Sequence, residues 1–475
     1  MRVNDYNHTI IEASKPVEGA IRQAAALFAA AFIAATLLVF ALPVSAQADV
    51  RKADEVMGET VGERDLSVSQ CPSISAERAA LVSADGTVFF TRNGKDEAQI
   101  ASITKVMTAI VAIDKAPEGL TVSVSADAAE IGESSAGLQE GDTMDLETAL
   151  KALLVPSGND AAVAIAEAVG ATLDGGSSKP VEAFVDAMNA KARELGLSNT
   201  VYENPHGLDD GEFAGDLHST ALDQTIVAKC AMGYPQIRDI VGGGSTTIKV
   251  NREGKKEEIE LETTDLLLDM YDHATGIKTG VTNLAGPSFM GSANKDGKDL
   301  FAIVLDCTDE YARFQDAKNL FEWGYEHVID LPLANTEQWT TMKSDGFTRD
   351  VPVIGEASHY EWIDRTVKAT MEKPDESVKI FDLEGNVSQK VEFDEIHGTV
   401  NVGDKVGTIT FYQNNEAIAS QNLVACERVD APNPIDTVVI WWSRTTQGLN
   451  DETGRASSKV YNVMPIINNN KSNAA

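Results

Sequence analysis

The sequence ASITKVMTAIV (residues 101–111) predicts a helix that buries one face in a protein core. Ser102 stands at the start of this helix and Lys105 follows three residues later, so both side chains face the same side, one turn apart. Burial and the positive end of the helix dipole both disfavour the charged form of Lys105. The pair therefore predicts a serine whose hydroxyl proton passes to a neutral lysine. The apolar residues recur at spacings of three and four, the period of an α-helix: Ile103, Val106, Met107, Ile110 and Val111.

The same S-x-x-K spacing occurs a second time, at Ser292 to Lys295. This copy runs into the polar turn Asp296-Gly297 and has no apolar helix behind it. We interpret it as a solvated loop. The spacing alone is a weak signal, and its surroundings favour Ser102.

A second motif, Ser157-Gly158-Asn159, lies between Pro156 and an alanine-rich helix. A hydroxyl in such a loop can relay a proton, and a carboxamide can both accept from a base and donate to a substrate carbonyl. The structural alternative is a plain loop that supplies an N-cap for the helix beginning at Asp160.

A third motif, Lys278-Thr279-Gly280, begins a strand-like stretch. A fixed ammonium and a hydroxyl can hold a carboxylate, and a glycine lets a substrate backbone lie against the strand. The order S-x-x-K, S-x-N, K-T-G is the combined motif of β-lactamases and penicillin-binding proteins. Taken together, the three motifs are a strong signal.

With these motifs in place, the sequence resembles the low-molecular-mass penicillin-binding proteins that act as D-alanyl-D-alanine carboxypeptidases. The resemblance covers about residues 73 to 330, and Thr399 to Ala425 resembles the C-terminal β domain of that family more loosely. The segments that carry it are residues 101–108, Ser157 to Ala161, Asn204-Pro205-His206-Gly207-Leu208, Ser219 to Asp223, Gly276 to Gly280, Ala285-Gly286 and the helix that starts at Arg313.

The resemblance implies a role for each matching residue. Ser102 would be the acylated nucleophile and Lys105 its general base, while Ser157 and Asn159 would shuttle the proton and orient the substrate. The terminal carboxylate would be bound by Lys278, Thr279 and Arg313, beside Gly280, and the backbone N–H groups of Ser102 and Val281 would form the oxyanion hole. His218 we interpret as structural. The implied partners are a peptidoglycan stem peptide ending in D-Ala-D-Ala and, as covalent inhibitors, β-lactam antibiotics; no cofactor is implied.

We expect an α+β fold, an antiparallel sheet flanked by helices, followed by a small all-β domain. The expected boundaries are a signal peptide at 1–48, a poorly ordered linker at 49–75, the catalytic domain at 76–331, the β domain at 332–443 and a disordered tail at 444–475. Expected first-domain elements are a hairpin within Ala79 to Phe90, helices at Leu146 to Leu154, Asp160 to Val169 and Ala312 to Tyr325, and strands at Ala285 to Ala293 and Leu300 to Asp306. Expected strands of the β domain are Val351 to Ile354, Glu361 to Lys368, Ser377 to Asp382 and Thr408 to Tyr412.

The N-terminus predicts export. Residues 24–42 contain no charged or strongly polar side chain, and Ala46-Gln47-Ala48 offers the small-x-small pattern at which a signal peptidase cuts. An uncleaved anchor is the alternative, because nineteen apolar residues approach the thickness of a bilayer core. Both readings place the protein outside the cytoplasmic membrane. Ile435 to Trp442 is an apolar run that we expect to be a strand, which leaves membrane association through the C-terminus an open possibility.

Composition narrows the function classes. Thirty-nine Lys and Arg against seventy-three Asp and Glu give a net charge of −34, which would repel nucleic acid. The four cysteines, Cys71, Cys230, Cys307 and Cys426, show no metal-site spacing, and their pairing stays open. The remaining alternatives to a carboxypeptidase are a DD-endopeptidase, a β-lactamase and a non-catalytic envelope scaffold. A β-lactamase lacks support because no class A glutamate loop is visible between Asn159 and Lys278.

Overall fold

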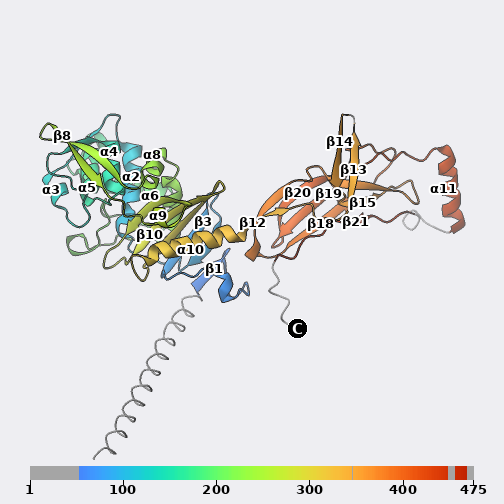
Figure 1. Cartoon of the computed structure of the whole chain (residues 1–475), viewed down its shortest axis with the longest axis horizontal. Coiled ribbons are helices and arrows are strands. Elements are labelled where there is room, and N and C mark those ends of the chain that lie inside the picture. Colours follow the sequence, from blue (N-terminus) through green and yellow to red (C-terminus); the bar gives the residue numbers. More distant parts are fainter. Residues whose placement is uncertain (1–52, 345, 448–454, 468–475) are drawn as a thin grey trace, which may run out of the picture. The chain divides into compact units, whose positions relative to one another are not determined.

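The first domain is organised around a seven-stranded sheet, in a computed structural model that describes residues 53–344, 346–447 and 455–467. The strands follow the order β2-β1-β4-β3-β11-β10-β9, and the pairs from β3 to β9 are antiparallel (Figure 1). Their bounds are β1 Asp54–Val56, β2 Glu59–Thr60, β3 Arg78–Ser83, β4 Val88–Arg92, β9 Ala274–Gly280, β10 Ser288–Lys295 and β11 Lys298–Leu305. The expected hairpin and the strand pair are confirmed.

The alternation of side chains along the strands gives the sheet two buried faces. On β3, Ala80 and Val82 pack with α2 (Thr104–Lys115) in the larger core cluster. Ala79 and Leu81 point the opposite way and pack with α10 (Ala312–His327) in a second cluster. The sheet is therefore covered by helices on both faces, which confirms the expected α+β class.

The remaining helices of the domain lie mostly on the α2 side. The expected helices are confirmed as α4 Leu146–Leu154 and α5 Asn159–Gly170, and the closing helix as α10. The others are α3 Ala126–Glu130, α6 Pro180–Glu194, α7 Ala221–Ala231, α8 Pro235–Gly242 and α9 Leu267–Met270. A smaller sheet, β5-β6-β7-β8, is made of β5 Thr121–Ser123, β6 Thr143–Asp145, β7 Thr246–Arg252 and β8 Lys255–Leu261.

The second domain is built on a six-stranded antiparallel sheet in the order β18-β19-β20-β16-β15-β21. Its strands are β15 Gly355–Ser358, β16 Thr366–Met371, β18 Val387–Phe393, β19 Lys405–Gln413, β20 Glu416–Ala425 and β21 Lys459–Val460. Two further antiparallel pairs complete it: β12 Val328–Pro332 pairs with the distant β17 Ser377–Phe381, and β13 Trp339–Ser344 forms a hairpin with β14 Phe347–Pro352. The expected all-β domain is confirmed, although β16 lies later in the chain than expected.

Three expectations about the ends of the domains are wrong. The described part of 49–75 is not a poorly ordered linker, because β1 and β2 pair there and Val56 is fully buried. Ile435 to Trp442 is not a strand but part of the helix α11 (Pro434–Gln447). The described part of the 444–475 tail is ordered, because β21 pairs with β15 and Asn462 is buried. The expected signal peptide lies outside the described residues.

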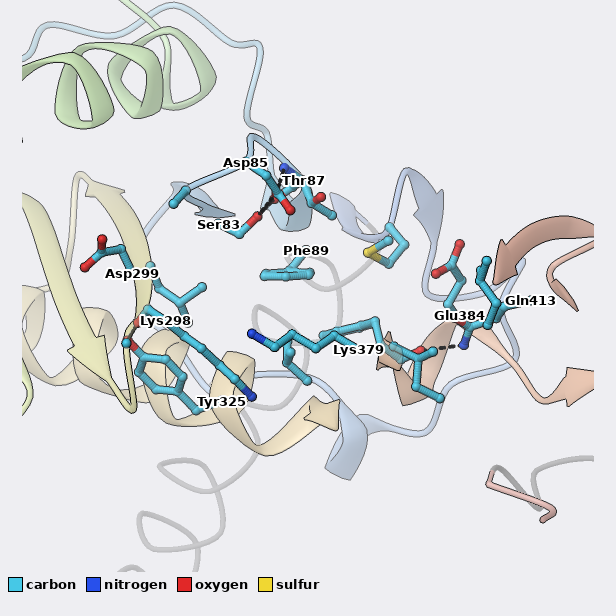
Figure 2. A pocket seen from close by; sticks show the side chains of 18 residues that line it. Ser83, Asp85, Thr87, Phe89, Lys298, Asp299, Tyr325, Lys379, Glu384 and Gln413 are labelled. Carbon is cyan, nitrogen blue, oxygen red and sulfur yellow. Dashed lines mark hydrogen bonds between the residues drawn. The ribbon is translucent and has the colours of Figure 1, made fainter. Parts of the chain in front are cut away.

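Aromatic rings join the second domain to the first. Phe381 stacks on Phe89 with ring centroids 5.0 Å apart, and His327 Nδ1 lies 2.7 Å from Asp382 Oδ1. A cavity of about 480 Å³ lies at this junction, with Lys298, Tyr325 and Lys379 in its lining (Figure 2). None of the residues expected in catalysis lines it.

Candidate active site

The serine and lysine of the first motif are in direct contact. Ser102 lies in a single 3₁₀ turn, Ala101–Ile103, that leads into α2, and Lys105 is in the first turn of that helix. The Lys105 Nζ atom lies 2.6 Å from Ser102 Oγ and donates to the backbone oxygen of His206 at 2.9 Å. The one-turn spacing therefore puts the amine where it can take the hydroxyl proton.

The surroundings of Lys105 favour the neutral amine. The side chain is completely buried, and this burial, aided by the positive charge of Lys278, lowers the pKa of Lys105 well below its ordinary value. The negative charge of Asp160 opposes the shift. A neutral amine has a lone pair that can accept a proton, which an ammonium lacks. The site thus meets the electrostatic requirement for a lysine base.

The K-T-G motif ends strand β9 rather than beginning one, which corrects the expectation from sequence. Gly280, the last residue of the strand, lies so close to the serine turn that a Cβ there would be 2.7 Å from the backbone oxygen of Ile100. Only glycine permits this approach, which places the K-T-G motif next to the turn that carries Ser102. Val281 follows directly and is half exposed.

Two cations gather at this end of β9. Lys278 is almost fully buried, and burial, together with the nearby charge of Arg313, lowers its pKa to about 7, against an opposing effect of Asp265. Arg313, on α10, donates to the backbone oxygen of Gly280 at 3.3 Å. The Thr279 and Thr264 hydroxyls lie 2.7 Å apart. Lys278 and Arg313 form a positive site suited to a carboxylate.

The S-x-N motif occupies the connection between α4 and α5. Ser157 is buried and adopts a left-handed backbone with φ +67°, a conformation that costs a non-glycine residue about 1–3 kcal/mol. Asn159 donates through its backbone N–H to Ser134 at 2.8 Å and through Nδ2 to Gly132 at 3.0 Å. Its Oδ1 is buried and has no hydrogen-bond partner. The amide is therefore held at its donor end, while its acceptor oxygen stays buried and unpaired.

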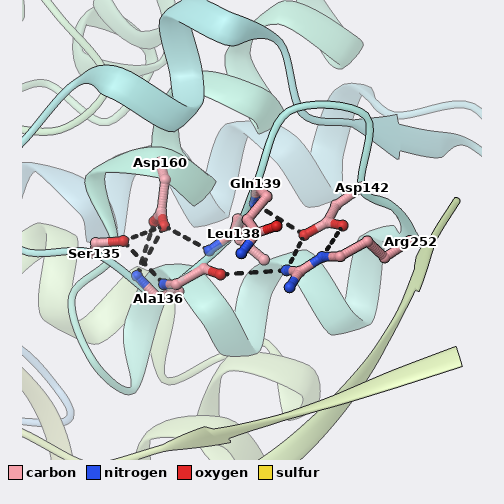
Figure 3. A network of polar contacts seen from close by, with 8 residues as sticks. Ser135, Ala136, Leu138, Gln139, Asp142, Asp160 and Arg252 are labelled. Carbon is pink, nitrogen blue, oxygen red and sulfur yellow. Dashed lines mark hydrogen bonds and ion pairs between the residues drawn. The ribbon is translucent and has the colours of Figure 1, made fainter.

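A polar network that sequence reasoning missed holds this motif in place (Figure 3). The Asp160 carboxylate accepts hydrogen bonds from Ser135 Oγ at 2.6 Å and from the backbone N–H groups of Ala136 and Leu138 at 2.9 and 3.1 Å. It is not the N-cap of α5, because Gly158 occupies that position. The available signal was the direct succession of Asp160 after Asn159, but its partners lie more than twenty residues upstream.

The second S-x-x-K copy lies elsewhere and is not a solvated loop. Ser292 is buried inside strand β10, where its hydroxyl lies 2.6 Å from Thr275 Oγ1, and Lys295 ends the same strand in solvent. His218 packs at the surface of the domain near Asp216 and Glu97, which fits the structural role expected for it. In the part of the chain that the structure describes, no cluster of His, Cys, Asp or Glu could hold a metal ion. Cys230, Cys307 and Cys426 are free thiols.

Comparison with known proteins agrees with the motifs. The model of the D-alanyl-D-alanine carboxypeptidase family, peptidase family S11, matches residues 65–309, just over half of the chain. The chain is 28% identical to D-alanyl-D-alanine carboxypeptidase DacF of Bacillus subtilis over 411 residues, which cover 84% of this chain and 94% of that protein.

Solved structures agree as well. The Streptomyces K15 DD-transpeptidase is 29% identical, with a TM-score of 0.50, over 54% of this chain and 98% of that one. The carboxypeptidase DacD from Francisella tularensis has a TM-score of 0.51 over 76% of this chain and 95% of that one; at 22% identity it supports the fold alone. The family match, on a chain whose buried lysine contacts its serine, shows that this protein belongs to the D-alanyl-D-alanine carboxypeptidase family of serine peptidases.

Proposed function

We propose that this enzyme removes the terminal D-alanine from peptidoglycan stem peptides through an acyl-enzyme on Ser102. The observation that carries the proposal is the 2.6 Å contact between Ser102 Oγ and the buried Lys105 Nζ. Ser102 Oγ attacks the carbonyl carbon of the penultimate D-alanine and its proton passes to Lys105. The C–N bond then breaks, the departing amine takes a proton through Ser157, and water hydrolyses the ester.

The cations at the end of β9 support the choice of a C-terminal residue as leaving group. In this proposal Lys278 and Arg313 bind the terminal carboxylate, with Thr279 beside them, and the backbone N–H groups of Ser102 and Val281 stabilise the oxyanion. The unpaired Oδ1 of Asn159 accepts, in this proposal, from the peptide N–H of the substrate or from Lys105. Because the net charge of −34 repels an anionic substrate at long range, a local cationic site such as this one is needed to hold its carboxylate.

Mass spectrometry of the penicillin-treated protein tests the assignment. We expect a stable adduct on Ser102 and, in a parallel assay, release of D-alanine from a peptide ending in D-Ala-D-Ala. Rapid turnover of penicillin without an adduct would indicate a β-lactamase, and absence of both reactions would indicate a scaffold. Cleavage of an internal cross-link in preference to the terminal residue would indicate an endopeptidase.

Enzymes of this family act on the cell wall, outside the cytoplasm. We propose that residues 1–48 direct this export and that helix α11 associates with a membrane surface. Ile435, Val438, Val439 and Trp442 form a helical stripe at i, i+3, i+4 and i+7, and each is more than half exposed, as is Trp441. None of the helices in the described ranges is long and apolar enough to cross a bilayer.

Vesicle co-sedimentation tests the membrane proposal. The intact mature protein should pellet with vesicles of anionic phospholipid, and the Trp441→Ser, Trp442→Ser variant should stay in the supernatant. Substituting Trp339, which is equally exposed but lies on β13, should change nothing. Equal sedimentation of the α11 variant would contradict the proposal without touching the catalytic assignment.

A further inference from the structure

The segment Gly132–Asp142, which we call the 132–142 loop, links the S-x-N motif to a distant hairpin. The loop connects α3 to β6 and its two ends make different contacts. In its first half, the backbone oxygen of Gly132 accepts a hydrogen bond from the side-chain amide of Asn159, and three groups donate hydrogen bonds to the Asp160 carboxylate. Its second half ends in Asp142, whose partner comes from β7, more than one hundred residues later (Figure 3).

The contact at the far end is a two-point ion pair. Arg252 Nε donates to Asp142 Oδ1 at 2.7 Å and its NH2 group donates to Oδ2 at 2.6 Å. The same NH2 group reaches the backbone oxygen of Gly137 at 3.4 Å. Asp142 also accepts from the backbone N–H of Gln139 at 2.9 Å, which closes the loop on itself. One guanidinium therefore binds the loop at two places, which a lysine cannot do with the same geometry.

Because the Asp142 carboxylate is buried, it depends on Arg252 for charge compensation. The Asp142 side chain is completely inaccessible, whereas that of Arg252 is 24% exposed. Burial alone would raise the pKa of Asp142, but the hydrogen bonds from Arg252 and Gln139 outweigh it and hold that pKa below its ordinary value. Removing Arg252 would leave a buried carboxylate without its counter-ion, a state that favours a displaced or hydrated loop.

We propose that Arg252 is a positioning residue for catalysis, which acts by fixing the 132–142 loop and through it the side-chain amide of Asn159. The Gly132 oxygen that accepts from Asn159 Nδ2 decides which end of the amide is left open, so a displaced loop would let the amide rotate. Arg252 touches neither the substrate site nor the nucleophile in this scheme. The inference rests on the proposed roles of Ser102 and Asn159.

The test is Arg252→Met in the full mature protein, measured as the acylation rate constant per active site with a chromogenic or fluorescent penicillin. Active sites are first counted by stoichiometric labelling, so that misfolded molecules do not enter the rate. We expect acylation about tenfold slower per site and a smaller change in the KM of a D-Ala-D-Ala peptide than in its kcat, because misplaced groups act mainly on the transition state. Arg252→Lys keeps the positive charge but cannot form both hydrogen bonds to the Asp142 carboxylate, so it should recover part of the rate.

Lys249→Met is the matched control. Lys249 lies on the same strand and pairs with Glu258 at 2.9 Å, and both side chains are about two-thirds exposed, away from the buried Asp142. It removes the same charge from the same hairpin, so its acylation rate should equal that of the parent. A slow rate in this control would assign the effect to the long-range field instead.

A double variant keeps the proposal testable if Arg252→Met folds poorly. Arg252→Met with Asp142→Asn removes the buried charge as well, and should still acylate more slowly than the parent because the contact between the loop and β7 is lost. A purely structural role predicts fewer labelled sites with an unchanged rate at each, and that result would overturn the inference. If the parent protein itself forms no adduct on Ser102, the proposed function fails instead.

Discussion

The chain contains two S-x-x-K segments with the same spacing. They differ in backbone conformation, since one lies at the start of a helix and the other on a strand. Ser102 and Lys105 span the start of a helix, where a separation of three places both side chains on one face. Ser292 and Lys295 lie on strand β10, where the same separation turns the two side chains to opposite faces. A motif therefore carries its chemistry only together with the backbone period that presents it.

Replacing each serine in turn is the strongest test of this comparison. Ser102→Ala should reduce D-alanine release and penicillin labelling by at least about a thousandfold, because no other group can form the acyl ester. Ser292→Ala should leave both reactions at the parent level. Labelling that survives in Ser102→Ala would contradict the assignment, and the labelled peptide would then identify the true nucleophile.

Replacing each lysine tests whether Lys105, and not Lys295, is the general base. Lys105→Ala should slow acylation by about 10²–10⁴-fold, the usual contribution of general base catalysis, while Lys295→Ala should have no effect. Because serine and lysine act as one unit, Ser102→Ala with Lys105→Ala should be hardly worse than Ser102→Ala alone. Stopped-flow acylation measures the single lysine variants. Additive losses in the double variant would show that the two residues act separately.

The cationic site beside the first segment predicts both a substrate preference and a pH profile. A peptide with an amidated C-terminus should be cleaved at least about tenfold less efficiently than the free acid, equivalent to about 1.4 kcal/mol of lost transition-state binding. Binding of the carboxylate needs protonated Lys278, whose pKa is lowered to about 7, so kcat/KM for the free acid should fall as pH rises past that value.

The amidated peptide is the control for this profile, because it has no carboxylate and should show no such fall. Arg313→Ala should reduce the preference for the free acid without abolishing acylation. Equal kcat/KM for the two peptides would reject the carboxypeptidase assignment in favour of an endopeptidase.

The smallest expected effect is a loss of protein stability on substitution of Ser292, in the second S-x-x-K segment. The Ser292 and Thr275 hydroxyls are hydrogen-bonded between β10 and β9, so Ser292→Ala should lower the free energy of unfolding by about 1 kcal/mol. Urea denaturation of the parent and the variant measures the loss. A decrease in activity per folded molecule, rather than in stability, would give Ser292 a role that the strand geometry does not.

Much of the active site could be predicted because its residues depend on local patterns. The helix at Lys105 follows from its apolar period, and the three motifs follow from short spacings. The position of K-T-G at the end of its strand was missed because the decisive contact, Gly280 against the backbone oxygen of Ile100, joins residues far apart in the chain. The loop that holds Asn159 was missed for the same reason, because nothing in the sequence indicates that Asp142 and Arg252, 110 residues apart, form an ion pair.

The errors at the ends of the chain have a different cause. Ile435 to Trp442 is rich in β-branched and aromatic residues, whose strand preference reflects packing on a sheet. Here no sheet receives them, and the segment forms α11 with its apolar stripe in solvent. Conversely, the polar sequence around Lys459 gains order only because β15 offers it an edge. Both outcomes depend on tertiary partners that propensity does not describe.

The register of the central sheet also determines when the first domain can complete its fold. β3 lies between β4 and β11, with Leu81 opposite Ala302, so a strand made early waits for one made about two hundred residues later. Until then its inner edge is open to other chains, as unpaired edges are. Gly280, which packs against the backbone before Ser102, ends β9, the strand that pairs with β10 just before β11, so this contact also depends on the late part of the domain. We therefore expect Ser102 to become reactive only once the chain has been made beyond Gly280, because the groups around it come from both ends of the domain.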